Sequence, residues 1–317
     1  MKVIGVIDRA ALLLLNTVMT QQLAALAVLA IRHINCSWAD AHVLDVYWKM
    51  CTYMPKVDTR ISADIHKQGC YECAAVNDML LTLRRHKASL LDIGANIGSY
   101  TLPAAADGHP VYAFELMPMN AAHLQSSLIA NSLENHVRLF PIAVGAKPGW
   151  STWTDPSTGE NKGGFSMRNH ENASSDELNH PNYPIIQLDS LPPISGPVFL
   201  KMDIEGSECK ALEGARERFL RAIDLVGFFM EWGSKLRHEC CNTILAPFFK
   251  ELQDRHSLTP YGRTEYGRMA GKNIPIAVAQ LCKKDARVRY QNLLWLRIGT
   301  RALGTALISR ADGPQDP

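Results

Sequence analysis

The sequence predicts an α/β fold with a doubly wound, mostly parallel sheet. A short apolar run that carries Asp92 is followed by Gly94 and Gly98 and then by a segment able to enter a helix. This is the pattern of a first parallel strand, a tight turn and a helix. Further short apolar segments alternate with segments of helical periodicity, and several of them lead into carboxylates. Ligands of open parallel sheets bind outside such strand ends.

The glycine loop admits two classes of nucleotide ligand. Glycine tolerates positive φ and close backbone approach, and the N–H groups that open the next helix attract polar ligands. A nicotinamide or flavin site calls for G-x-G-x-x-G, whereas this loop offers only Gly94 and Gly98. Asp92 followed by G-x-x-x-G is closer to the nucleoside-binding turn of S-adenosylmethionine-dependent methyltransferases. A purely structural turn is the third interpretation.

Apolar spacing predicts the elements of the first half. Val76, Leu80 and Leu83 recur at helical spacing, so we expect a helix over 70–86, whose basic C-terminal residues suit the helix dipole. The residues from about 36 to 65, with several aromatic side chains, are expected to cap one end of the domain. The other elements are predicted as a strand at 89–93, a helix at about 99–106, a strand at 110–115, a helix at 120–131 and a strand at 137–144.

The second half contains a polar stretch and the central strand. From Gly145 to about Tyr183 we expect a short edge strand at 152–154 and a substrate lid, with plain disorder as the alternative. The central strand and its exit, at 197–206, end in charged residues that are costly to bury unless they are paired or functional. The remaining elements are predicted as a helix carrying Leu212, Ala215, Phe219 and Ile223, a strand at 225–230, a helix at 242–256, strands at 258–261 and 291–298, and a polar tail from Ser309 to Pro317.

The N-terminus indicates a membrane or secretory location. Residues 10–31 are uncharged and mostly apolar, which approaches the roughly 20 residues needed to span a bilayer. The polar residues between 16 and 22 are also compatible with an amphipathic helix that packs on the protein. A cleaved signal is a further alternative, with Ala39-Asp40-Ala41 as the signal-peptidase site. The alternative is a cytoplasmic protein.

The cysteines and the charge set further bounds. Four of the 8 cysteines lie between 36 and 73 and would form two bridges in an oxidising compartment, with their connectivity open, or free thiols in the cytosol. Cys70 and Cys73 lack the second ligand pair of a zinc site. The net charge of +2 gives no reason to expect a nucleic-acid partner.

Carboxylates at strand ends are the candidate functional residues. Glu115 ends the second predicted strand, 23 residues after Asp92, where an acidic side chain reaches the hydroxyls of a ribose. A solvated glutamate is the alternative at that position. Asp203 and Glu231 end the central strand and the strand after it.

The motifs together resemble those of the FkbM family of methyltransferases. They are the segments 91–98, 114–115, 200–208 and 230–232, of which Lys-x-Asp-x-Glu-Gly-x-Glu is the most specific. Asn120 also matches the family, whereas Leu116 stands where a proline is common. The resemblance covers about residues 68–300. Together with the apolar N-terminus and the polar tail, it suggests four regions: a signal or anchor segment at 1–35, a cap or linker at 36–67, the methyltransferase domain at 68–300 and a tail at 301–317.

The resemblance implies a seven-stranded Rossmann-like sheet and S-adenosylmethionine as the methyl donor. It assigns the cofactor loop to Asp92, Gly94, Asn96 and Gly98 and the ribose to Glu115. Asp203 would lie near the methyl group and also contact the cofactor, and Glu231 is assigned to the substrate side. Known members mostly methylate hydroxyl oxygens of sugars or small molecules, so we expect a small-molecule or glycan acceptor and no nucleic acid.

Two other functions remain open at this stage. One is a nicotinamide-dependent oxidoreductase, which the missing Gly-x-Gly disfavours. The other is a membrane-tethered binding protein with a vestigial cofactor pocket, which the retained carboxylates disfavour. Asp203 and Glu231 have the chemistry to orient or deprotonate a hydroxyl. Magnesium on these carboxylates is conceivable, but no third ligand is evident, and no metal site is predicted.

Overall fold

The structure, a computed structural model, describes residues 34–153, 167–168, 183–232, 240–263, 274–275, 281 and 292–297. The expected hydrophobic segment at 10–31, most of the expected lid and the expected tail lie outside these residues. None of the helices within the described ranges has the length and apolar character needed to cross a membrane.

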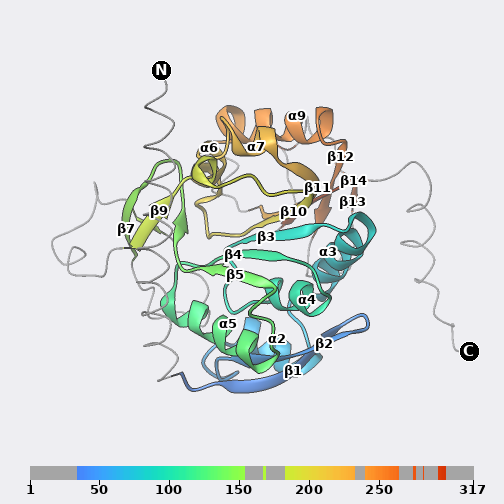
Figure 1. Cartoon of the computed structure of the whole chain (residues 1–317), viewed down its shortest axis with the longest axis vertical. Helices are drawn as coiled ribbons and strands as arrows, with labels where there is room; N and C mark the ends of the chain where they lie inside the picture. The colour runs from blue at the N-terminus through green and yellow to red at the C-terminus, as the bar shows by residue number, and fades with distance from the viewer. Residues whose placement is uncertain are drawn as a thin grey trace, which may run out of the picture.

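A central sheet carries the fold, in the strand order β13–β12–β14–β11–β10–β3–β4–β5 (Figure 1). The neighbours from β11 to β5 pair in parallel, and β14 runs antiparallel to both β11 and β12. Seven of these strands have four or more residues, so the prediction of a seven-stranded, mostly parallel sheet is confirmed. The strands are β3 (Ser89–Ile93), β4 (Val111–Phe114), β5 (Val137–Phe140), β10 (Pro197–Met202), β11 (Asp224–Glu231), β12 (Leu258–Arg263), β13 (Ile274–Pro275) and β14 (Asn292–Arg297).

Helices cover both faces of the sheet, as Figure 1 shows. One face packs against α3 (Cys73–His86), α4 (Thr101–Ala106) and α5 (Pro118–Ala130). The other packs against α6 (Glu208–Glu213), α7 (Phe219–Ala222), the π-helical turn η4 (Cys241–Leu245) and α9 (Ala246–Asp254). Successive strand residues alternate between these cores, since Leu90 joins the first and Leu91 the second. A sheet buried on both faces favours apolar residues at most positions, which explains its nearly continuous apolar runs.

The expected cap contains a hairpin and a helix. The hairpin strands are β1 (Ser37–Val43) and β2 (Val46–Thr52), and the helix is α2 (Ile61–Gln68). The hairpin lies against α4 and α5 (Figure 1). Its Trp48 and Met50 are buried in the same apolar core as Leu90 of the sheet. The cap therefore shares a hydrophobic core with the sheet, while the predicted boundary near residue 68 stays a prediction.

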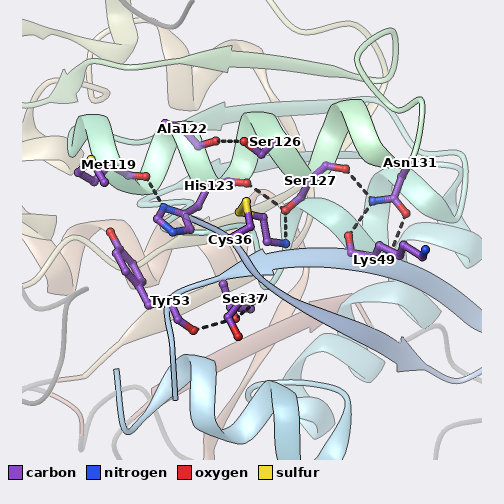
Figure 2. Close-up of a disulfide and its surroundings, with 12 residues drawn as sticks. Cys36, Ser37, Lys49, Tyr53, Met119, Ala122, His123, Ser126, Ser127 and Asn131 are labelled. Atoms are coloured by element: carbon purple, nitrogen blue, oxygen red, sulfur yellow. Dashed lines mark hydrogen bonds between the residues drawn. A yellow bond between two sulfur atoms is a disulfide. The ribbon is translucent and has the colours of Figure 1, made fainter. Parts of the chain in front are cut away.

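Polar contacts fix the hairpin on α5 (Figure 2). The backbone N–H of Cys51 donates to Ser127 Oγ at 2.8 Å, and this hydroxyl donates to the carbonyl oxygen of His123. Asn131 exchanges two hydrogen bonds with the backbone of Lys49, at 2.8 and 2.7 Å. A disulfide between Cys36 and Cys51 closes the hairpin beside these contacts.

The predicted strand at 137–144 is divided in two by Pro141. Proline has no N–H to donate to the ladder, so β5 ends at Phe140. The chain then enters a separate four-stranded sheet in the order β6–β9–β7–β8. These strands are β6 (Ala143–Val144), β7 (Gly149–Trp153), β8 (Met167–Arg168) and β9 (Tyr183–Ile186).

The helix predicted across Leu212 to Ile223 is also wrong as a single element, because α6 and α7 are separate. Backbone packs on backbone at Gly214, where a Cβ atom would lie 2.1 Å from the carbonyl oxygen of Gly145. Asp189, in the 3-10 turn η3 (Leu188–Ser190), then accepts N–H bonds from residues 217, 218 and 219 and caps α7. These hydrogen bonds stabilise the start of a second helix, α7, within a series of apolar residues whose spacing predicts a single helix.

Candidate active site

The glycine loop joins β3 to α4 through three left-handed residues. Gly94, Asn96 and Gly98 have φ values of 88°, 52° and 104°. A Cβ atom at Gly94 would lie 1.8 Å from the carbonyl oxygen of Asp203, so the loop packs directly on the exit of β10. A Cβ atom at Gly98 would meet Leu124 of α5. Gly94 is therefore required by packing on the protein's own backbone, and Gly98 is favoured by its positive φ and by the adjacent side chain of Leu124, in addition to any ligand.

Asp92 lies beneath the loop and is fully buried. Its Oδ2 accepts a hydrogen bond from the Thr101 hydroxyl at 2.7 Å, and its Oδ1 lies 3.4 Å from Nζ of Lys201. Asp92 and Lys201 are register partners in the adjacent strands β3 and β10, so their side chains project from the same face. The Asp92 carboxylate thus binds groups of the protein that hold the loop.

Lys201 connects the loop to Asp203. Its Nζ donates to the carbonyl oxygen of Gly94 at 2.5 Å and lies 3.9 Å from Asp203 Oδ2. Burial opposes the charged form, but Asp92, Asp203 and Glu72 outweigh this effect and raise the pKa of Lys201 above its ordinary value. The side chain is therefore an ammonium ion that joins the ends of β3 and β10.

Glu115 follows β4 and is almost completely buried. Its Oε2 accepts the N–H of Asn96 and its Oε1 accepts the N–H of Met117, both at 2.7 Å. Burial raises the pKa of Glu115 to about 7, against the lowering effect of these two bonds and of the charge on Lys201. Glu115 therefore lies at the glycine loop, as the spacing from Asp92 predicted.

A polar chain runs from Glu115 back to the cap. The Asn120 side chain is hydrogen-bonded to Glu115 and accepts a bond from the Tyr53 hydroxyl at 2.7 Å. The Tyr53 ring packs on His123, with ring centroids 4.1 Å apart, and Figure 2 shows the two rings side by side. The cap thus supports the position of Glu115 through Asn120.

Three carboxylates converge at the ends of β10 and β11. Asp203, Glu208 and Glu231 each place a carboxylate oxygen within 4.8 Å of the others. Burial, and then the negative charges of Asp203 and Glu205, raise the pKa of Glu231 well above its usual range. Asp203 remains about one third exposed, with a side-chain exposure of 35%. The sheet edge here is strongly acidic.

Glu208 and Glu205 complete this acidic edge. Glu208 is fully buried, and its Oε1 accepts the N–H groups of Ile204 and Gly206 at 2.9 and 3.3 Å. Burial raises its pKa. Glu205 adopts a left-handed φ of 53°, and burial, reinforced by Asp203, raises its pKa to about 7. The left-handed turn at Glu205 brings the first turn of α6, which carries Glu208, close to the ends of β10 and β11.

Glu72, the residue before α3, also acts electrostatically on Lys201. Its Oε2 accepts a bond from the Tyr100 hydroxyl at 2.7 Å, and its Oε1 accepts one from the Asn292 amide at 3.0 Å. Asn292 of β14 is in turn the register partner of Glu231. Glu72 therefore ties the start of α3 to β14, the strand that pairs with β11.

The family of this sequence can now be stated. Residues 92–251, half of the chain, match the model of the methyltransferase FkbM domain. The chain belongs to the FkbM family. The match begins at Asp92 and includes every carboxylate that the site brings together except Glu72. Methyltransferases of this family take S-adenosylmethionine as the methyl donor, as the resemblance implied.

Solved structures similar to this FkbM-family chain include methyltransferases. They include FkbM from Methylobacillus flagellatus (16% identity, TM-score 0.39, 66% of this chain and 43% of that one). They also include an S-adenosylmethionine-dependent O-methyltransferase from Thermotoga maritima (12%, 0.33, 72% and 66%) and the human METTL16 catalytic domain in complex with an RNA hairpin (14%, 0.34, 72% and 70%). The chain thus spans less than half of the Methylobacillus protein. Comparison with curated proteins gave no match.

Some residues of the FkbM-family site were not assigned from the sequence. Glu208 was named only as part of the Lys-x-Asp-x-Glu-Gly-x-Glu motif and was given no role. Its position in the first helical turn after the central strand is a sequence signal that indicates a site residue. Glu72 and Tyr53 precede the glycine loop, and no spacing relates them to it. Their contacts depend on how α3 and the cap fold back over the sheet.

Proposed function

We propose that the chain is an S-adenosylmethionine-dependent O-methyltransferase that acts on a hydroxyl group of a sugar or small molecule. The observation that carries this proposal is the acidic edge formed by Asp203 and Glu231 next to the glycine loop. Transfer to a hydroxyl requires that the oxygen be aligned with the methyl–sulfur bond and lose its proton. Carboxylates at the strand ends suit both tasks.

The polar groups at the loop fit S-adenosylmethionine. The Glu115 carboxylate accepts two backbone N–H groups and a bond from the Asn120 side chain, which leaves acceptor capacity for a ribose hydroxyl. When bound, the cofactor supplies an electrophilic methyl group on a sulfonium cation. Asp92 and Lys201 hold the loop from beneath, so we assign Asp92 to positioning the loop, with Gly94, Asn96 and Gly98 nearer the cofactor.

Asp203 and Glu231 are given different roles in this proposal. Asp203 follows β10 at the contact with Gly94, so we place it beside the cofactor's methyl group. Glu231 ends the neighbouring strand and faces the acceptor. Its raised pKa makes the ionised form of Glu231 a stronger base toward a hydroxyl proton than an ordinary carboxylate.

The proposal extends to the acceptor and to the location of the protein. We propose a small-molecule or glycan acceptor and no nucleic acid, in keeping with the net charge of +2. We also propose the membrane or secretory pathway as the location, with residues 10–31 as the targeting segment. The disulfides Cys36–Cys51, Cys70–Cys73 and Cys209–Cys240 support an oxidising compartment.

Substitution of Asp203 tests the function. We expect Asp203→Asn to keep the melting temperature and most of the affinity for S-adenosylhomocysteine, while methyl transfer to the accepted hydroxyl compound falls by about 10²–10⁴-fold. Asp254→Asn, which alters an exposed ion pair of α9, is the control. Normal turnover in Asp203→Asn would remove Asp203 from catalysis. Tighter binding of NADH than of S-adenosylhomocysteine would favour the oxidoreductase, and cofactor binding with no methylated product in any hydroxyl library would favour a vestigial pocket.

A further inference from the structure

We propose that Asp203, Glu208 and Glu231 form a binding site for one divalent metal cation. Cation binding by these three carboxylates does not depend on methyl transfer. A second element, that the open positions of the cation hold the acceptor oxygen, rests on the proposed function.

The first argument is the origin and chemistry of the three ligands. Asp203 follows β10, Glu231 ends β11 and Glu208 lies in the first turn of α6, and their oxygens lie within 4.8 Å of one another. Carboxylate oxygens are the ligands that Mg²⁺ and Mn²⁺ prefer. Glu208 is the third ligand that the sequence did not reveal. Three such groups repel one another when no cation lies between them.

The second argument is an unsatisfied oxygen inside the cluster. Glu208 is fully buried, and its Oε2 has no hydrogen-bond partner among the residues that the structure describes. A buried polar oxygen without a partner typically costs about 1–3 kcal/mol. Its Oε1 is held by the N–H groups of Ile204 and Gly206, which fixes the plane of the carboxylate. Such outer contacts orient the ligands of metal sites.

The third argument is that the nearby ammonium group of Lys201 already interacts with other groups of the protein. Lys201 lies 3.9 Å from Asp203 but is closer to Asp92, at 3.4 Å, and donates to the Gly94 carbonyl. Lys201 therefore compensates the buried Asp92 and leaves most of the charge of the cluster unbalanced. The partial exposure of Asp203 provides room for water or an acceptor oxygen on the cation.

The decisive measurement is Mn²⁺ binding to the full chain without cofactor, followed by the loss of the free Mn²⁺ electron paramagnetic resonance signal. We expect one saturable site per chain, from which excess Mg²⁺ displaces Mn²⁺. Glu208→Gln keeps an oxygen that can accept the N–H groups of Ile204 and Gly206, and it replaces the unpartnered oxygen with an NH2 group that cannot bind a cation. The Mn²⁺ affinity should therefore fall about 10-fold or more. Glu213→Gln removes an exposed charge from the same helix and should bind Mn²⁺ like the wild type.

The outcomes separate this proposal from the proposed function. The metal site is overturned if the wild type shows no saturable Mn²⁺ binding or if Glu208→Gln binds Mn²⁺ with the same affinity as the wild type. Either result would be expected if the carboxylates instead share protons or contact the sulfonium directly. Glu231→Gln provides the same comparison if Glu208→Gln does not fold. S-adenosylhomocysteine binding is measured on the same preparations. Cofactor binding without Mn²⁺ binding refutes the metal site alone, and Mn²⁺ binding without cofactor binding refutes the proposed function alone.

Discussion

At the residue scale, Glu115 is buried and accepts hydrogen bonds from two backbone N–H groups and from the Asn120 side chain, and burial raises its pKa from 4.5 to about 7. A ribose would donate hydrogen bonds to the ionised carboxylate, so binding would favour loss of this proton. The free protein therefore carries a carboxyl group whose protonation links stability, cofactor binding and pH.

We expect the stability of the wild type relative to Glu115→Gln to fall as the pH rises. Because the folded-state pKa lies above the unfolded value of 4.5, the neutral acid stabilises the fold below pH 4.5, and this contribution is lost as the pH rises through about 7. The difference amounts to about 3 kcal/mol at most. Urea unfolding at pH 5 and pH 8 measures it, with the exposed Glu134→Gln as control. A difference that does not change with pH would show that burial leaves the Glu115 titration unperturbed.

Sequence reasoning located Glu115, Asp203 and Glu231 because a strand that ends in a carboxylate is visible in a single segment. Glu208 was not assigned, because the left-handed turn at Glu205 that brings it to the strand ends is not indicated by any apolar pattern, and its place in the first helical turn after β10 is the one local signal. The glycines were assigned to ligand approach, yet Gly94 is also required by the carbonyl of Asp203, more than 100 positions later in the chain. Where the role of a residue depends on contacts with distant parts of the chain, a local sequence pattern could not predict it.

At the element scale, β3 coincides with the predicted strand at 89–93, since its boundaries follow from one apolar run and one glycine. The hairpin was expected only as an unspecified cap. Its outer positions hold exposed Trp38 and Tyr47, which obscure the alternation typical of a half-buried strand. The hairpin is identified by its contacts with α5, which are 76 or more positions away.

We expect the bond between β2 and α5 to contribute measurably to stability. Ser127→Ala leaves the buried N–H of Cys51 without its acceptor, which should cost about 1–3 kcal/mol. Ser126→Ala removes a neighbouring hydroxyl that bonds only within α5, to the Ala122 carbonyl, and should change stability by less than about 0.5 kcal/mol. Chemical unfolding of both variants measures the difference. Equal stabilities would indicate that water replaces the lost acceptor and that the hairpin is held by its apolar face.

At the scale of the whole molecule, the cap and the sheet share one core and one polar chain to Glu115. We expect a variant that begins at residue 34 to fold and bind S-adenosylhomocysteine, since every described contact of the site is retained. A variant that begins at residue 70 should aggregate, because it uncovers the buried face that receives Trp48, Met50 and Ile65. Size-exclusion chromatography and calorimetry test both. A soluble, cofactor-binding protein from residue 70 would make the cap an independent unit.

The place of β14 has a consequence for biosynthesis. This strand lies between β11 and β12, although both precede it in the chain. Until residues 292–297 have left the ribosome, a nascent chain holds the facing edges of β11 and β12 without the strand that joins them. Open edges recruit strands from other chains. Premature termination before Asn292 should therefore yield aggregation-prone polypeptide, because β14, the last strand among the described residues, completes the sheet beside Glu231.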